Sequence, residues 1–324
     1  MRAERRTLFA GSAAFATALA LPAAAQAPAS APGPTATQAP GFYRFKVGGF
    51  TVTTVHDGFF RRPVEGFVRN APAAEVQALL AEQGMPQDTL TVPFTITFVE
   101  TPRGLVVFDS GTGGQMAPTA GMMAANMRAA GLDPARVNAV VVSHFHGDHI
   151  TGLTTAQNEA VFPNAEVVVP AAEWAFWTDE GNASRAPEGQ RGTFANTARR
   201  FAPYRARIRQ VEDNAEVLPG IRAVAAHGHT PGHTLYHVAD GDAQMMFLAD
   251  LTNRPEVNAR RPDWQIVFDM DGDAAAATRR RIMDRVSSER MRVTGYHFPF
   301  PSNGMMVRDG QGYRFAPADW SGVV

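Results

Sequence analysis

The hydrophobic pattern of the chain predicts strands in both halves, with helices between them. Two alternating stretches at 43–47 and 50–55 flank Gly48-Gly49, which is typical of a two-residue hairpin turn. Further runs of hydrophobic residues, several of them alternating or rich in β-branched residues, predict the other strands. These strands are expected at 91–99, 105–108, 139–142, 165–169, 221–226, 234–239, 243–249, 291–296 and 312–316.

Helical segments are predicted between these strands, at 73–82, 122–130, 171–177, 194–201 and 274–286. Pro203 ends the fourth of these segments, because proline cannot continue a helix interior. Two packed sheets with helices outside fit this order of elements. No composition break follows residue 41, so 41–324 is interpreted as a single α+β domain.

The N-terminus has the pattern of an export signal. Arg5-Arg6 precedes an apolar, alanine-rich run, and Ala23-Ala24-Ala25 offers small residues for cleavage. The arginine pair is typical of a twin-arginine signal over residues 1–25. The Ala/Pro-rich stretch 26–40 is interpreted as a disordered linker. The mature protein is therefore expected to be periplasmic or secreted, without stable membrane association.

The composition of the chain excludes several classes of function and leaves the predicted fold unchanged. The formal net charge is −1, which argues against a nucleic-acid surface, because such a surface needs a basic patch. The chain has no cysteine, which excludes thiolate ligands, a cysteine nucleophile and disulfides. The expected partner is a small-molecule substrate, and a homodimer is left open as the assembly.

The segment 143–149, Ser-His-Phe-His-Gly-Asp-His, is the strongest candidate for chemistry. It follows the buried-strand pattern Val140-Val141-Val142, so it is expected at the end of a strand. Alternate side chains of an extended segment face the same way, so His144 and His146 can share one metal ion. Asp148 and His149 lie in the turn beyond and can reach a second ion.

More residues of metal-ligand type follow other predicted strands. The tight turn 227–233 contains three histidines, of which the pattern alone does not select one. Asp250 follows the strand 243–249, and His297 follows the strand 291–296. One metal ion needs only three or four protein ligands. Seven candidates therefore indicate two ions, with one carboxylate bridging them.

These motifs resemble those of the metallo-β-lactamase superfamily of binuclear hydrolases. The resemblance rests on His144-x-His146-x-Asp148-His149, on Gly228-His229, and on Asp250 and His297. Gly41-Phe42-Tyr43-Arg44, the turn 227–233, Phe298-Pro299-Phe300-Pro301 and Gly312-Tyr313-Arg314-Phe315 are similar to segments of its methyl parathion hydrolase-like, lactonase-like group. The resemblance covers nearly all of the chain after residue 40. It implies the four-layer αββα sandwich, in which two mixed sheets are flanked by helices.

The resemblance also implies roles for single residues. His144, His146 and His229 would hold one divalent ion, Asp148, His149 and His297 the other, and Asp250 would bridge them. Zinc is the expected metal, with manganese and cobalt as alternatives. Asp109 and His233 are expected to support the ligands from a second layer. The predicted walls of the substrate pocket are Met116, Trp177, Phe194, Phe298 and Phe300.

The expected activity is hydrolysis at a carbonyl or phosphoryl centre by a hydroxide that bridges the two metal ions, with Asp148 as a proton shuttle. Lactones and aryl esters are the preferred substrates, and organophosphate triesters come next. Two alternatives are a zinc β-lactamase-like enzyme and a non-catalytic periplasmic metal-binding protein. The former is disfavoured because the resemblance gives zinc β-lactamases no aspartate at the position of Asp250.

Overall fold

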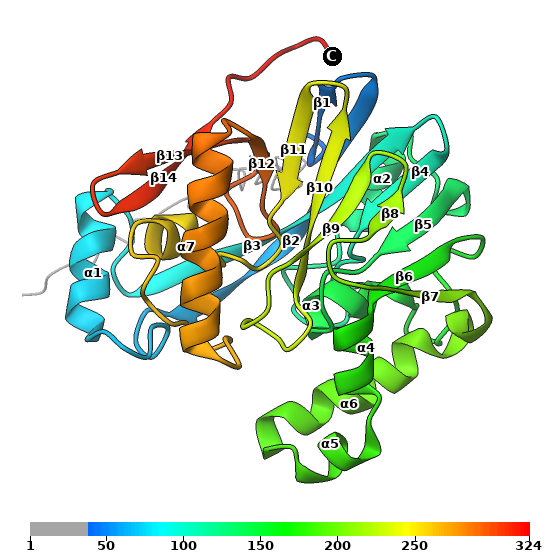
Figure 1. The fold of residues 1–324 in the computed structure, drawn as a ribbon, viewed down its shortest axis with the longest axis horizontal. Coiled ribbons are helices and arrows are strands. Elements are labelled where there is room, and N and C mark those ends of the chain that lie inside the picture. Colours follow the sequence, from blue (N-terminus) through cyan, green and yellow to red (C-terminus); the bar gives the residue numbers. More distant parts are fainter. Residues whose placement is uncertain (1–37) are drawn as a thin grey trace, which may run out of the picture. The chain divides into compact units, whose positions relative to one another are not determined.

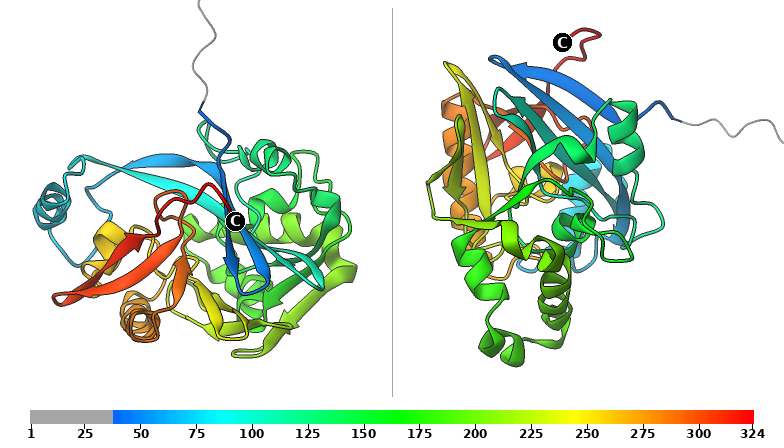
Figure 2. Two further views of the ribbon diagram at one scale, coloured as in Figure 1. Left: turned by 90° about the horizontal axis from the view of Figure 1, so that it is seen from above. Right: turned by 90° about the vertical axis from the view of Figure 1, so that its right-hand side faces the viewer.

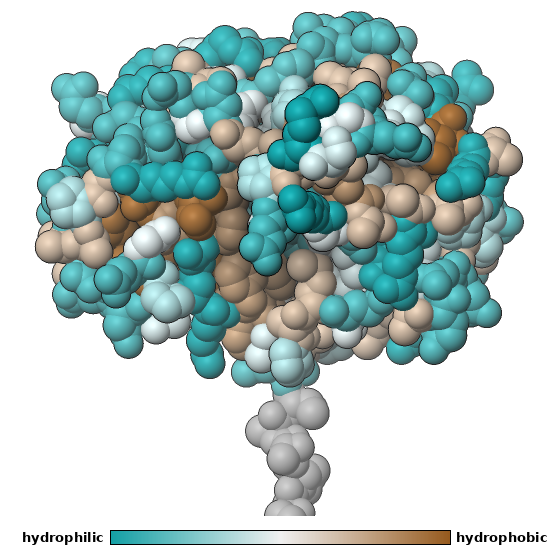
Figure 3. Space-filling model, turned by 90° about the horizontal axis from the view of Figure 1, so that it is seen from below, coloured by the Kyte–Doolittle hydropathy of each residue, from teal (hydrophilic) through white to brown (hydrophobic). Residues whose placement is uncertain are grey.

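The computed structural model describes residues 38–324, which form one compact unit from residue 39 onward. The predicted signal at 1–25 and most of the predicted linker at 26–40 lie outside the described residues. Within the described part, none of the helices combines the length and the apolar character needed to span a bilayer. On the face seen in Figure 3, hydrophobic residues lie in hollows of a largely hydrophilic surface.

Seven strands form the first sheet, in the order β1 to β7. Strands β1 to β4 pair antiparallel, and β4 to β7 pair parallel. The inner parallel strands β5 and β6 are rich in valine because both of their faces are largely buried. The bounds are β1 Phe42–Val47, β2 Phe50–Pro63, β3 Thr89–Thr101, β4 Gly104–Phe108, β5 Val137–Val141, β6 Glu166–Pro170 and β7 Ile208–Val211.

The second sheet also has seven strands, in the order β14-β13-β12-β11-β10-β9-β8. All neighbours pair antiparallel except β11 and β12, which are parallel, so both sheets are mixed. The bounds are β8 Glu216–Leu218, β9 Ile221–Ala225, β10 Thr234–Asp240, β11 Ala243–Phe247, β12 Arg292–Thr294, β13 Gly304–Asp309 and β14 Gly312–Pro317.

The two sheets pack face to face with helices outside them, which confirms the predicted αββα sandwich (Figures 1 and 2). Phe108 of the first sheet stacks on Tyr236 and Phe247 of the second, with ring centroids 5.2 and 5.0 Å apart. The helices are α1 Ala73–Glu82, α2 Met123–Ala129, α3 Gly147–Ile150, α4 Ala171–Trp177, α5 Glu180–Arg185, α6 Glu188–Phe201 and α7 Gly272–Ser288. Shorter helical turns are η1 Pro134–Arg136, η2 Thr151–Leu153, η3 Ala202–Arg207 and the π-helical η4 Pro255–Ala259.

The predicted elements are largely present, and the hairpin at Gly48-Gly49 is formed with Val47 opposite Phe50. The pattern did not predict β7, β8, β13, α3 or α5. Strand β7 is short and half-exposed, and its Arg209 and Gln210 hide the hydrophobic pattern. Helix α6 begins six residues before the predicted start at Phe194. The prediction began too late because the first turns of the helix are polar and carry no apolar stripe.

Candidate metal centre

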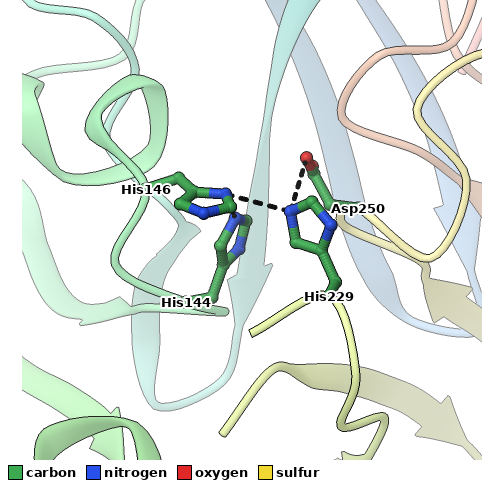
Figure 4. Close-up of side chains that lie close together, drawn as sticks. All are labelled: His144, His146, His229 and Asp250. Carbon is green, nitrogen blue, oxygen red and sulfur yellow. Dashed lines mark hydrogen bonds and ion pairs between the residues drawn. The ribbon is translucent and has the colours of Figure 1, made fainter. Parts of the chain in front are cut away.

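The seven predicted ligands form two groups. They come from four segments, namely those that follow β5, β11 and β12 and the loop between β9 and β10. In each group, one nitrogen or carboxylate oxygen per residue lies within 4.8 Å of the corresponding atoms of the others. The side chains of the first group point toward one another (Figure 4). The first group is His144, His146, His229 and Asp250, and the second is Asp148, His149 and His297.

In the first group, specific ring nitrogens converge on one point. His144 Nε2 lies 3.1 Å from His146 Nδ1, and His146 Nδ1 lies 3.0 Å from His229 Nε2. His229 Nε2 is also 3.3 Å from Asp250 Oδ2. Two different sheets contribute to this group, since His144 and His146 follow β5 whereas His229 precedes β10. The structure thereby selects His229 from the three histidines of its turn.

Asp250 lies between the two groups and contacts both. Its Oδ1 is 3.1 Å from His149 Nε2, and its Oδ2 is 3.1 Å from His297 Nε2. Asp148 Oδ2 completes the second group at 3.6 Å from His149 Nε2 and 3.4 Å from His297 Nε2. A carboxylate that contacts ligands of both groups has the arrangement expected of a bridge.

A second layer of hydrogen bonds orients the imidazoles. Each of the four rings that direct Nε2 into the centre has its Nδ1 bonded on the outer side, which is the usual support for histidine ligands of metals. The outer contacts are His144 to Ser143 Oγ at 3.0 Å, His149 to Asp109 Oδ2 at 2.8 Å, His229 to Asp269 Oδ1 at 2.9 Å, and His297 to the Pro93 carbonyl at 2.9 Å.

Asp109 and His233 occupy the supporting positions that the sequence predicted for them. Asp109 follows β4 and accepts hydrogen bonds from the Ser143 amide and hydroxyl, so it connects two neighbouring strand ends. His233 donates from Nδ1 to the Ala226 carbonyl, and its Nε2 accepts from the Asp250 amide at 3.3 Å. Burial lowers the pKa of His233 to about 3, so the ring is neutral and both nitrogens are occupied.

The electrostatics of the cluster couple its imidazoles to Asp250. Burial lowers the pKa of His144 well below its ordinary value, and the neighbouring His149 lowers it further. Burial also opposes protonation of His229, but hydrogen bonds to Asp250 and Asp269 outweigh it and raise its pKa to about 9. Although burial acts in the opposite direction, His297 and His149 lower the pKa of Asp250 well below its ordinary value.

The donor set fits two divalent cations. His149 Nε2 and Asp250 Oδ1 lie 3.1 Å apart without forming a hydrogen bond, and both are buried with no other hydrogen-bond partner among the described residues, as expected of atoms that ligate an ion. Five imidazoles suit zinc and other late first-row metals, and two carboxylates add harder ligands. His144, His146, His229 and Asp250 would hold one ion, and Asp148, His149, His297 and Asp250 the other.

A cavity of about 390 Å³ opens beside Asp148, Asp250 and His297. The predicted wall residue Met116 lines it. Most of its other walls are apolar and come from Phe60, Phe94, Ala117 and Phe268. The cavity is within the size range of small-molecule sites.

The other predicted wall residues require correction. Trp177 and Phe194 line a separate cavity between α4, α5 and α6, and the Trp177 indole donates to Glu173 at 2.7 Å, away from the metal ligands. Phe298 is fully buried and packs on Phe315, with ring centroids 4.9 Å apart. Phe300 lies against His56 at 5.5 Å. Sequence adjacency to His297 did not place either phenylalanine in the cavity wall.

Sequence reasoning missed several supporting residues. Asp269 binds His229 and forms an ion pair with the buried Arg279 at 3.2 Å. Asp57 accepts hydrogen bonds from the amides of Thr112 and Met123, and so fixes the loop that carries Met116. Both carboxylates lie far from the ligands along the chain, and no spacing or strand-end pattern marks them.

Comparison with known proteins identifies the family. Residues 93–288 match the model of the metallo-β-lactamase superfamily, a match that covers more than half of the chain. The chain therefore belongs to this superfamily. With its His/Asp centre, it is a metal-dependent hydrolase. A search of the curated proteins returned no match.

Several solved structures share the fold. Hydrolase AbOPH of the β-lactamase superfamily is 26% identical, with a TM-score of 0.83 over 88% of this chain and 100% of that one. AidC, a dizinc quorum-quenching lactonase in complex with the product N-hexanoyl-L-homoserine, is 24% identical, with a TM-score of 0.81 over 87% and 98%. A probable metal-dependent hydrolase from Staphylococcus aureus is 18% identical, with a TM-score of 0.70 over 85% and 100%.

Proposed function

We propose that the protein is a binuclear zinc hydrolase that acts on neutral, hydrophobic lactones or aryl esters, with organophosphate triesters as slower substrates. The observation that carries this proposal is the cavity beside the metal ligands, whose walls are mostly apolar and carry no charge apart from the ligands themselves. Apolar walls exclude water and strengthen electrostatic interactions with a bound carbonyl or phosphoryl group. Such a cavity favours a substrate that carries no charge of its own.

When bound, two divalent ions polarise a substrate oxygen and make water a nucleophile at neutral pH. The chain contributes the orientation of the ligands and the handling of protons. Asp148 has its carboxyl group 18% exposed at the cavity wall, whereas that of Asp250 is 4% exposed. Asp148 is therefore the carboxylate that we assign to carry a proton from the attacking water to the leaving oxygen. The Tyr296 hydroxyl, which donates to the Asp148 carbonyl at 2.6 Å, holds this residue in place.

The cavity argues against a zinc β-lactamase-like activity. A β-lactam carries an acid group, and a site that binds it would need a cationic side chain to pair with that group. The lining residues include no lysine or arginine. Arg254 is the nearest arginine after Asp250 along the chain, but it is buried and its guanidinium pairs with Glu256 at 2.9 Å. This arginine is therefore not part of the cavity wall.

The similar structures support the choice of substrate class. AidC is described as a dizinc lactonase and contains an N-acyl-homoserine product, and AbOPH is described as a hydrolase. The direct test is a panel of an N-acyl-homoserine lactone, a p-nitrophenyl ester, a paraoxon-type triester and a cephalosporin, each assayed with Zn²⁺, Mn²⁺ and Co²⁺. We expect turnover of the lactone or the ester. Efficient cephalosporin cleavage without lactone or ester turnover would overturn the proposal, and absence of any turnover would favour a binding protein.

Asn253 is expected to orient substrates that carry an amide. It lines the cavity and is 2% exposed, and its Oδ1 has no partner among the described residues. A hydrogen bond to this group is worth about 1 kcal/mol, which corresponds to about fivefold in affinity. Asn253→Ala should therefore reduce kcat/KM for an N-acyl-homoserine lactone about fivefold. A γ-alkyl lactone of equal length, which lacks the amide, is the control and should change much less. Equal losses on both substrates would show that Asn253 has no selective contact.

We also propose export by a twin-arginine route, on the basis of Arg5-Arg6 and the small residues before residue 26. Replacing both arginines by lysine preserves the charge of the segment. If the pair is recognised as arginines, the double variant should accumulate as an uncleaved precursor in the cytoplasm of an expressing bacterium. Cell fractionation with immunoblotting measures this. Normal amounts of processed protein in the periplasm would refute the twin-arginine interpretation.

A further inference from the structure

Glu173 has a buried carboxylate that the proposed mechanism does not use. It lies in the first turn of α4, is fully buried, and forms no ion pair within residues 38–324. Four donors approach its two oxygens instead. They are the Phe145 amide at 2.9 Å, the Trp177 indole at 2.7 Å, the Thr230 hydroxyl at 2.8 Å and the Gly232 amide at 2.8 Å.

These contacts place one carboxylate between the two loops that carry the three-histidine group. Phe145 stands between His144 and His146, so its amide fixes the backbone between two ligands. Thr230 and Gly232 stand one and three residues after His229 on the loop from the other sheet. The Glu173 backbone is close to the same loop, because a Cβ added to Gly232 would lie 2.1 Å from the Glu173 nitrogen.

The chemistry of the partners requires a carboxylate at this position. Three of the four donors are N–H groups, which cannot accept a hydrogen bond, so the ionised form satisfies all of them. Hydrogen bonds to a charged acceptor are stronger than neutral ones, and breaking them in the interior leaves unpaired polar groups. Glutamine would keep the size of the side chain, but its NH₂ group would face at least one N–H donor in either orientation, so at least one contact is lost together with the negative charge.

We propose that Glu173 is a positioning residue that holds the β5 loop and the β9–β10 loop at the distance at which His144, His146 and His229 share one metal ion. Glu173 contacts neither the loop of Asp250 nor that of His297, so its effect should fall on the three-histidine site and spare the other site. The proposal rests on the metal centre of the proposed function, but it does not depend on the identity of the substrate.

The test is cobalt binding to Glu173→Gln, with Trp177→Phe as the matched control. The control removes one of the four hydrogen bonds, from a helix that carries no ligand. Apo protein is titrated with Co²⁺ and followed by visible absorption, and circular dichroism checks the fold. Loss of support behind a ligand typically weakens metal binding by about 10–100-fold. We expect Glu173→Gln to bind one Co²⁺ like the wild type and the second about 10–100-fold more weakly, and Trp177→Phe to bind both normally.

Two unchanged Co²⁺ affinities in Glu173→Gln would overturn the proposal. Equal weakening in Trp177→Phe would overturn it as well, because the effect would then be one of general packing. If Glu173→Gln does not fold, Thr230→Val removes only the hydrogen bond next to His229, and unchanged Co²⁺ binding in that variant would also contradict the proposal. A wild-type protein that binds both ions but hydrolyses no substrate of the panel would instead refute the proposed function and leave the positioning role intact.

Discussion

Replacing Asp250 with alanine is expected to reduce kcat by more than about 100-fold while the chain remains folded. The Asp250 carboxylate contacts ligands of both groups, through His149 Nε2 and through His229 and His297. Variants of supporting residues behind metal ligands lose about 10–100-fold, so loss of a shared ligand should exceed that range. The measurement combines steady-state kinetics on the preferred ester or lactone with elemental analysis of the purified variant.

Asp242→Ala provides the control for Asp250→Ala. Asp242 is an exposed aspartate in the turn between β10 and β11, eight residues away along the chain. We expect it to retain both metal ions and full activity. Near-normal turnover in Asp250→Ala would mean that Asp250 is only a strand-end residue, and the assignment of a shared ligand would have to be abandoned.

Asp269→Ala is expected to cause the largest loss of stability. Asp269 is fully buried, binds His229 Nδ1 and pairs with Arg279, whose guanidinium is also buried. Removing one partner of a buried ion pair leaves an uncompensated charge and costs about 3–5 kcal/mol. Urea denaturation of the metal-free protein measures this loss separately from metal binding. Metal affinity should also fall by about 10–100-fold, because His229 loses its outer hydrogen bond.

Asp269→Asn separates the two effects. Asparagine retains an oxygen that can accept from His229 or Arg279, but it carries no negative charge. We therefore expect a smaller loss of stability than in Asp269→Ala, with metal binding still weakened. If alanine at this position costs less than about 1 kcal/mol, well below the range for a broken buried pair, then the Asp269–Arg279 pair does not stabilise the fold as argued here.

Much of the fold follows from local pattern. Strand β5 was predicted because a run of valines favours extended backbone, and the hairpin was predicted because a glycine pair permits the positive φ of a tight turn, as found at Gly48. Strands such as β7 and β8 were missed because they are short, and Arg209 in β7 interrupts its pattern. Their strand conformation comes from pairing with a neighbour in the sheet, which local sequence does not record.

The metal centre was predictable because its ligands follow predicted strands directly. His144, Asp250 and His297 each stand at or just beyond such a strand end, so the order of strands alone brings them together. The choice of His229 over His227 was not predictable from local pattern, since both stand in one turn. The choice depends on the direction of the two rings, because the His229 ring faces His146 and the His227 ring faces solvent. His227 instead lies at the surface, 3.2 Å from Asp213.

The substrate cavity was the least predictable part of the site. Trp177 was predicted to line the cavity because the resemblance implies that its position faces the pocket for the leaving group. Its indole instead turns toward the Glu173 carboxylate, because a buried N–H needs an acceptor. Phe60 and Phe94 line the cavity but were not predicted to do so, because Phe94 has the pattern of an ordinary strand residue and Phe60 lies beyond the strand predicted at 50–55. Segments far apart in the sequence form this cavity, and which of their side chains point into it cannot be derived from local sequence.

The central claim is that seven His and Asp side chains hold two metal ions that together support hydrolysis. Its most direct test is a titration of metal-free protein with Zn²⁺ under conditions of tight binding, with turnover of a chromogenic ester or of a lactone followed at each addition. Turnover should continue to rise until two equivalents of Zn²⁺ per chain have been added, and then level off. A plateau at one equivalent, or turnover that is independent of added metal, would contradict the binuclear account.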